Sequence, residues 1–295
     1  MDIEYVPAKT IVTKNKNTAW FGTDYNMNIY RGCCHGCIYC DSRSECYRID
    51  DFDTVKAKKN ALEIIRNDLK SKNSTGVVGT GAMSDPYNPY EKDLKLTRNA
   101  LELINAYGFG IAIATKSDLI TRDIDILKDV KKVSPVLAKI TVTTSDDEIA
   151  SKVEPNAPRP SKRFSAIEKL SSSGIYTGIL MMPVLPFIED NPDNITEIIH
   201  MAKESGAKFI YPAFGVTLRT NQRDWYYEKL SESFPGLSQK YKSKYGNAYE
   251  CRSPKAKELW EMFSQLCREN RILFGMSEII RAYKADYTDL QLKLF

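Results

Sequence analysis

The sequence has no long hydrophobic run. None of its apolar stretches approaches the roughly 20 residues that a membrane-spanning helix requires, because Lys, Asp or Glu interrupts each candidate. The first five residues, Met1-Asp2-Ile3-Glu4-Tyr5, have neither the basic nor the apolar region of a secretory signal. Low-complexity segments are also absent, since the 295 residues are 42% hydrophobic and 27% charged, as in ordinary globular proteins. We therefore expect a soluble, cytoplasmic protein with no membrane partner.

A strong excess of one charge is missing as well. The 42 basic and 38 acidic side chains leave a formal net charge of +4. Nucleic-acid-binding proteins usually carry a larger excess that is clustered on one face. Lysines gather at residues 56–59 and 240–244, but runs of this kind are more often solvated helix faces. The charge therefore neither requires nor excludes a nucleic acid as a partner.

Cysteine, in contrast, is concentrated in one short segment. The chain has seven cysteines, whereas a disulfide framework requires an even set spread through a short secreted chain. Four of the seven lie within residues 33–40, namely Cys33, Cys34, Cys37 and Cys40. Of these, Cys33, Cys37 and Cys40 have the spacing Cys-x3-Cys-x2-Cys. Three thiolates on one tight loop can converge on a single metal centre.

Two kinds of metal centre are compatible with this loop. A structural zinc ion normally takes four protein ligands, and Cys34 or His35 is available as the fourth. However, Cys34 adjoins Cys33, and neighbouring side chains tend to point apart, while His35 is enclosed between two ligands. A [4Fe–4S] cluster on three cysteines instead keeps one iron without a protein ligand, free to bind a chelating substrate. The zinc alternative would make the protein a non-catalytic metal-binding module.

Predicted strands and helices alternate along the chain. Short β-branched or apolar runs predict strands at residues 27–30, 76–79, 110–115, 139–143, 177–182 and 208–212. Between them, apolar residues at helical spacing predict helices at residues 55–69, 96–107, 124–133, 161–172 and 192–205. Asn191 and Pro192 form a helix start signal, and Gly108, Gly174 and Gly206 lie at element boundaries. This alternation predicts an α/β fold with parallel strands, either an open sheet or a barrel.

Residues 216–295 follow the sixth predicted strand. They are expected to be mostly helical, with helices at 224–234 and 254–267 and a short apolar run at 271–276. Since no linker rich in Pro or Ser precedes them, we expect this extension to pack on the domain formed by residues 1–215 rather than to move freely.

Polar residues follow the predicted strands, where parallel barrels carry their active sites. After the second strand, residues 79–91 include Ser84 and Asp85 but not the lysine of a phosphate-binding loop. The third strand ends in Lys116, which is placed to face the mouth of a barrel and to pair with a carboxylate. We predict that these three residues line a ligand site, with an ordinary turn and a solvated lysine as the alternatives.

Two further positions are candidates for binding the same ligand. The side-chain period of the fourth strand puts Thr141 and Thr143 on one face, and two hydroxyls there suit the amino and carboxylate groups of an amino-acid-like cofactor. Ordinary strand threonines are the alternative. Arg163, in a loop that leads into a helix, can make a forked contact with a carboxylate or a ribose, or can simply be exposed.

Taken together, these motifs resemble the radical S-adenosylmethionine (SAM) superfamily, and within it the spore photoproduct lyase-like proteins that are often labelled "DNA repair photolyases". The matching stretches are Asn28-Ile29-Tyr30-Arg31-Gly32-Cys33 through Cys40, Ser84-Asp85-Pro86-Tyr87 with Glu91 and Leu96-Thr97-Arg98, Thr115-Lys116-Ser117, Glu154-Pro155 with Arg163, and Pro183-Val184-Leu185-Pro186. The resemblance implies a partial (β/α)6 barrel over residues 1–215, with a cluster loop at 31–41, and a mostly helical extension over residues 216–295.

The resemblance also implies cofactors and a reaction. The ligands of a [4Fe–4S] cluster would be Cys33, Cys37 and Cys40, and the residues in contact with SAM would be Ser84, Lys116 and Thr141, with Tyr39 beside the adenine. The reduced cluster would cleave SAM into methionine and a 5′-deoxyadenosyl radical, which abstracts hydrogen from a substrate that the sequence does not identify. Ferredoxin or flavodoxin would supply the electron.

One departure from this branch concerns DNA repair. In spore photoproduct lyase, a cysteine just ahead of the Ser-Asp pair supplies the hydrogen atom that quenches the product radical. The corresponding stretch here is Gly81-Ala82-Met83 and contains no thiol. We therefore expect a lyase-like radical SAM enzyme whose reaction is unassigned, and we do not carry over the repair of thymine lesions.

An enzyme that acts on lesions in nucleic-acid bases is the alternative. It would require a basic groove with aromatic side chains on which bases stack. The candidates for such a groove are Trp225, Tyr226, Tyr227, Lys229 and the lysine-rich stretch 240–245, although a packed amphipathic helix explains the same pattern.

Overall fold

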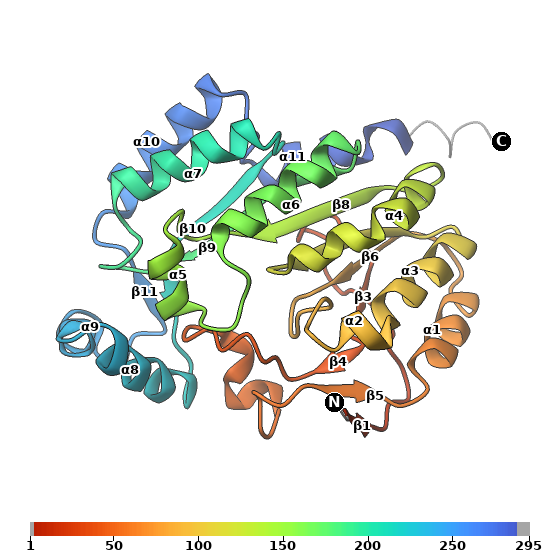
Figure 1. Ribbon diagram of the computed structural model, residues 1–295, viewed down its shortest axis with the longest axis horizontal. Coiled ribbons are helices and arrows are strands. Elements are labelled where there is room, and N and C mark those ends of the chain that lie inside the picture. The colour runs from red at the N-terminus through yellow and green to blue at the C-terminus, as the bar shows by residue number, and fades with distance from the viewer. Residues whose placement is uncertain (1–2, 288–295) are drawn as a thin grey trace.

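In the computed structural model, which describes residues 3–287, the chain is organised around an eight-stranded sheet in the order β11-β10-β9-β8-β7-β6-β3-β2 (Figure 1). Each strand from β3 to β10 in this order pairs in parallel with its neighbour. The parallel strands are β3 (Tyr25–Met27), β6 (Val77–Thr80), β7 (Gly110–Thr115), β8 (Val136–Thr141), β9 (Tyr176–Val184) and β10 (Ile210–Thr217). Antiparallel β2 (Val12–Lys14) and β11 (Glu250–Arg252) form the two edges. The predicted α/β fold of partial-barrel type is confirmed.

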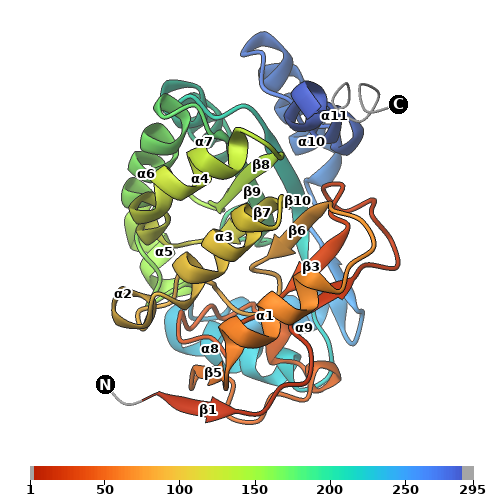
Figure 2. The same cartoon turned by 90° about the vertical axis from the view of Figure 1, so that its right-hand side faces the viewer.

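Helices connect successive parallel strands and cover the outer face of the sheet. Figure 2 shows α3, α4, α6 and α7 side by side along the strands. The connecting helices are α1 (Ala61–Lys70), α2 (Glu91–Leu94), α3 (Leu96–Ala106), α4 (Ile124–Lys131), α5 (Asp147–Val153), α6 (Pro160–Ser172) and α7 (Pro192–Glu204). The start signal of α7 is confirmed, because the Asn191 side chain accepts a hydrogen bond from the backbone N–H of Asn194.

The two faces of the sheet are packed differently. Alternate residues of a strand point to opposite faces. On β7, Ile111 lies in the large core beneath the helices, whereas Ala112 faces the interior of the barrel. On β8, Ile140 likewise faces the helices, while Lys139 and Thr141 line an interior cavity. Small and polar side chains in the barrel interior therefore leave room for a ligand.

Two sequence predictions near the N-terminus were wrong in detail. The helix expected at 55–69 begins only at Ala61, because residues Lys56–Lys58 form strand β5. This strand pairs with β1 (Glu4–Val6) and β4 (Tyr30–Arg31) in a second sheet, and that pairing overrides the helical spacing of the sequence. For the same reason the strand expected at 27–30 is divided between β3 and β4. In contrast, the lysines at 240–244 lie exposed on a helix, as predicted.

The C-terminal residues pack on the barrel. They include α8 (Gln222–Ser233), α9 (Leu237–Tyr245), α10 (Ala256–Glu269) and α11 (Met276–Lys284). Helix α10 packs against α7 and β10, and the Tyr283 hydroxyl on α11 donates a hydrogen bond of 2.7 Å to the carbonyl of Phe21. The predicted division between residues 215 and 216 falls within β10 and stays a prediction. Within residues 3–287, no helix has the length and apolar character needed to cross a membrane.

Candidate active site

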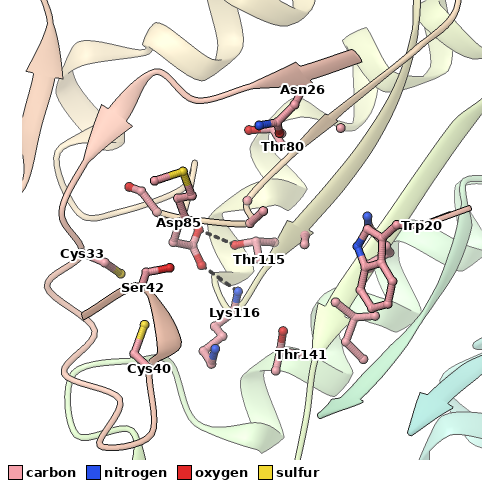
Figure 3. Close-up of a pocket in the computed structure, with 18 of the residues that line it drawn as sticks. Trp20, Asn26, Cys33, Cys40, Ser42, Thr80, Asp85, Thr115, Lys116 and Thr141 are labelled. Atoms are coloured by element: carbon pink, nitrogen blue, oxygen red, sulfur yellow. Dashed lines mark hydrogen bonds between the residues drawn. The ribbon is translucent and has the colours of Figure 1, made fainter. Parts of the chain in front are cut away.

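A cavity of about 540 Å³ lies at the C-terminal ends of the parallel strands. The three spaced cysteines line it together with residues from the loops that follow β6 and β7 and with residues of strand β8. Figure 3 shows Cys33 and Cys40 on one side of this cavity and Trp20 on the opposite side, with Lys116 and Thr141 between them. The predicted site residues that line the cavity are Cys33, Cys37, Cys40, Ser84, Asp85, Lys116 and Thr141.

The cysteine loop is fixed by backbone contacts with two other segments. The N–H of Cys33 donates to the carbonyl of Phe52 at 2.8 Å, and the N–H of Ile38 donates to the carbonyl of Val153 at 3.0 Å. Gly32 has a φ of +78°, and a Cβ there would lie 2.3 Å from the carbonyl oxygen of Thr54, so only glycine fits. These contacts hold Cys33, Cys37 and Cys40 at one cavity, whereas Cys34 does not line it.

The three thiols of the loop lie in a buried environment at the cavity. Burial raises the pKa of the Cys33 thiol to about 12 and also raises the pKa values of Cys37 and Cys40, so these groups need a metal to hold them as thiolates. Within residues 3–287, no three His, Cys, Asp or Glu side chains are close enough to hold one ion. A tetrahedral zinc site would place four donors about 2 Å from one point, whereas each cysteine of a [4Fe–4S] cluster can bind a different iron.

The loop after β6 supplies a polar atom that lacks a partner. Gly81 has a φ of +93°, and a Cβ there would lie 1.8 Å from the carbonyl oxygen of Ala114, so glycine lets this loop lie against the end of β7. Ser84 follows, and its hydroxyl is buried without a hydrogen-bond partner in the described part of the chain. Since buried hydroxyls are normally satisfied, Ser84 fits a bound ligand.

Asp85 connects three segments around the cavity. Its carboxylate accepts hydrogen bonds from the Thr115 hydroxyl at 2.6 Å, from the Lys116 N–H at 2.8 Å and from the Tyr87 N–H at 2.9 Å. It also lies 3.6 Å from Nδ1 of His35 in the cysteine loop. The carboxylate is therefore engaged by protein groups, and it positions Lys116 and the cysteine loop relative to each other.

Lys116 belongs to a buried charge network. Its Nζ lies 3.7 Å from Oε1 of Glu154, which also forms an ion pair with Arg163 and accepts a hydrogen bond from the Tyr39 hydroxyl. Burial alone would lower the pKa of Lys116, but Cys37, once its thiol is ionised, and the Glu154 carboxylate raise it overall. Lys116 therefore carries a positive charge at the cavity, as a group that binds a carboxylate requires.

Three predicted cofactor-binding residues lie behind the cavity wall. Tyr39 and Arg163 are turned toward Glu154, and the Thr143 hydroxyl donates to Glu189 at 2.8 Å. Arg163 is almost completely buried, which excludes the exposed alternative. These residues support the wall, and direct contact with a cofactor stays a prediction for them.

The end of the cavity opposite the cysteines was not predicted. It includes Trp20, Asn26, Thr80 and Lys139. Lys139 had a signal in the sequence, because it precedes Thr141 by two residues and therefore shares its face of the strand. Trp20 and Asn26 had none, since they come from the N-terminal segment that only the folded chain brings to the barrel.

Several known proteins resemble this chain in sequence or in fold. The sequence model of the radical SAM superfamily matches residues 27–202. An uncharacterized protein of Mycobacterium tuberculosis is 28% identical over 247 residues, which cover 81% of this chain and 72% of that protein. The radical SAM Nalpha-GlyT isomerase of Pseudomonas phage M6 is 27% identical over 211 residues, which cover 65% of this chain and 43% of that protein. A spore photoproduct lyase complexed with dinucleoside spore photoproduct has a similar fold, with a TM-score of 0.63, 14% identity and coverage of 90% and 79% of the two chains.

Proposed function

This chain belongs to the radical SAM superfamily, and we propose that it reductively cleaves SAM at a [4Fe–4S] cluster bound by Cys33, Cys37 and Cys40. The observation that supports this proposal is that the three thiols line the same cavity as Lys116 and the unpartnered hydroxyl of Ser84. When bound, the cluster and SAM supply a 5′-deoxyadenosyl radical that can abstract a hydrogen atom from a substrate.

The protein groups at the cysteine end would bind and orient SAM. The Lys116 ammonium would hold its carboxylate, and the Ser84 and Thr141 hydroxyls would hydrogen-bond to its polar atoms. Asp85 fixes the backbone at Lys116, while Glu154 limits the directions in which the ammonium can point. The buried walls would exclude water, which protects a reactive radical from side reactions.

Two further expectations belong to the same proposal. An external one-electron donor, of the ferredoxin or flavodoxin class, would reduce the cluster. The reaction would take place in the cytoplasm, where thiols stay reduced.

A modified nucleoside is a second candidate for the substrate, because the structurally similar spore photoproduct lyase is complexed with a dinucleoside photoproduct. Two of the aromatic residues predicted to stack on bases do not support it, since Tyr226 and Tyr227 are buried in a cluster of aromatic side chains, while the third, Trp225, lies against Arg43. Trp20 supports it better, because it lines the cavity and is 44% exposed. Salt-dependent binding of oligonucleotides would distinguish a nucleic acid from a small substrate.

The central test is the reaction of the anaerobically reconstituted chain with dithionite and SAM. We expect about four irons per chain, the content of one [4Fe–4S] cluster, and formation of 5′-deoxyadenosine that stops when SAM is omitted. A chain that holds a full cluster but forms no 5′-deoxyadenosine would contradict the proposal. Deuterium transfer from labelled candidate substrates into 5′-deoxyadenosine would then identify the hydrogen donor.

A further inference from the structure

A lysine inside the barrel lies apart from the charge network of the cysteine end. Lys139 is on β8, two residues before Thr141 and roughly 7 Å from it along the strand, and both side chains line the cavity. The Lys139 side chain is almost completely enclosed, with 3% of the residue exposed. The cavity is therefore the space into which its ammonium group opens.

The neighbours of Lys139 leave space beside it and form an aromatic floor. In the sheet register, its partners are Ala114 on β7 and Gly178 on β9, which are too small to reach over the ammonium group. Nζ lies 4.6 Å from the centre of the Phe21 ring, which packs against Phe209 at 5.8 Å. This floor is apolar, so the floor itself cannot supply an anion to the lysine.

The charge of Lys139 lacks a counter-ion in the described part of the chain. Among residues 3–287, no carboxylate forms an ion pair with it, and Asp85, the acidic residue that lines the cavity, is engaged by Thr115 and by the Lys116 backbone. Burial lowers the pKa of the Lys139 ammonium to about 7, and no opposing charge is near enough to raise it. Holding an unpaired cation in such a place is costly, because desolvation is not offset by an ion pair.

We propose that Lys139 binds an anionic group of the substrate, a carboxylate or a phosphate, and thereby places the substrate in the half of the cavity opposite the cysteines. Trp20 packs at the same end, because its ring contacts Phe21 at 5.0 Å, and it provides a flat apolar wall. Asn26 and Thr80 add neutral polar groups to this end. The role of this site in catalysis rests on the proposed function, but its affinity for anions does not.

Anion binding can be measured on the isolated full chain, with or without its cluster. The probes are inorganic phosphate and acetate, each compared with sodium chloride at equal ionic strength, and the readout is the midpoint of thermal unfolding. We expect one of the two anions to raise the midpoint of the wild-type chain by roughly 2–4 °C above chloride. Phosphate and acetate distinguish a phosphorylated substrate from a carboxylic acid.

Three variants assign this effect to one lysine. Lys139→Met should lose the response to the anion, while Lys132→Met, at an exposed lysine, and Lys116→Met should retain it. A response that survives in Lys139→Met, or that disappears only in Lys116→Met, would overturn the proposal. So would a wild-type chain that responds to neither anion.

A spectroscopic readout is independent of stability. In protein labelled with 13C at the lysine ε-carbons, the signal that disappears in Lys139→Met reports the titration of that group. Bound anion should raise the midpoint of this titration by about one pH unit or more, since an opposite charge favours the protonated form. An unchanged midpoint would contradict the proposal.

The proposed cleavage of SAM and the proposed anion site at Lys139 can fail independently of each other. Lys139→Met should keep the iron content and SAM affinity of the wild type, because Lys139 lies outside the predicted cofactor contacts. If the wild-type chain forms no cluster but its anion response depends on Lys139, the proposed function fails and the anion site remains.

Discussion

Two lysines line one cavity, and their surroundings shift their pKa values in opposite directions. Lys116 has Glu154 beside it at 3.7 Å and keeps a raised pKa despite its burial. Lys139 has an aromatic floor and small neighbours, and its pKa falls to about 7. Lys116 is therefore charged in the ligand-free protein, while Lys139 becomes fully charged only when a bound ligand supplies an anion. This difference suits a cofactor beside Lys116 and an exchanging substrate beside Lys139.

The largest effect should come from the loop that builds the cysteine end. Cys37→Ala removes one of three cluster ligands, and we expect the reconstituted chain to lose most of its iron and all 5′-deoxyadenosine formation. Cys34→Ala is the matched control, because Cys34 does not line the cavity and should leave about four irons per chain. Iron and sulfide analysis measures both. Loss of the cluster on Cys34→Ala alone would overturn the ligand assignment.

The charge network beneath Lys116 should be the next most sensitive. Arg163 and Glu154 are each 1% exposed, and Arg163→Met would leave a buried carboxylate with only Lys116 as a cation. We expect the free energy of unfolding to fall by about 3–5 kcal/mol, the usual cost of breaking a buried pair. Lys152→Met, in an exposed pair with Glu148, is the control and should change stability little. Urea unfolding measures both variants. Equal losses of unfolding free energy in Arg163→Met and Lys152→Met would show that burial does not determine how much an ion pair contributes to stability.

Lys139, at the other end of the cavity, should have the opposite effect on stability. Its buried ammonium group has no counter-ion among residues 3–287 and therefore destabilises the ligand-free protein. Burial lowers the pKa of Lys139 from 10.5 in the unfolded chain to about 7 in the folded one. The unfolded chain thus binds more protons between these pH values, so stability should rise with pH across this window, by at most about 1.4 kcal/mol per pH unit. Below pH 7 the full penalty is present, and above pH 10.5 it is absent.

Lys139→Met should therefore stabilise the protein at pH 7 by up to about 4 kcal/mol, since it removes this penalty. The gain should shrink steadily as the pH approaches 10.5. Urea unfolding of both chains at several pH values measures it. A gain that does not depend on pH would indicate better packing by Met rather than removal of a charge.

The contrast between the two ends also separates what the sequence could predict from what it could not. The cysteine spacing, the serine and the lysine after the strands and the alternation of elements are local patterns, and they led to the fold and to the cysteine end of the cavity. Trp20 joins the other end through contacts with Phe21 and Tyr211, which depend on the closed barrel. Arg163 was ambiguous because its burial depends on Glu154, nine residues earlier, and on the β8 strand end.

A smaller effect is expected at the cofactor contact itself. Lys116→Met should weaken SAM binding by roughly 1.5–3 kcal/mol, the usual contribution of a hydrogen bond to a charged group. The cluster should stay intact, since Glu154 keeps its pair with Arg163. Calorimetric titration of SAM into the unreduced, reconstituted chain measures this, with Lys132→Met as the control. Unchanged affinity would remove Lys116 from the cofactor site.

The smallest effect should be on a thymine lesion, for which we expect almost no turnover. Within residues 3–287, the thiols that line the cavity are Cys33, Cys37 and Cys40, all proposed as cluster ligands, and the stretch Gly81-Ala82-Met83, where a hydrogen-donating cysteine is expected, contains no thiol. Cys251 does not line the cavity, and it is buried beside tyrosines in the hydrophobic cluster that also contains Cys37.

The reduced enzyme incubated with dinucleotide spore photoproduct should therefore form 5′-deoxyadenosine without releasing thymidylyl-thymidine catalytically. Met83→Cys places a thiol at the cavity within this stretch, and it is the variant in which repair would first become measurable. Many turnovers by the wild-type chain would show that another group quenches the product radical. Because the anionic group that Lys139 binds would then be a phosphodiester rather than a carboxylate, the same result would require the anion response to come from phosphate and not from acetate.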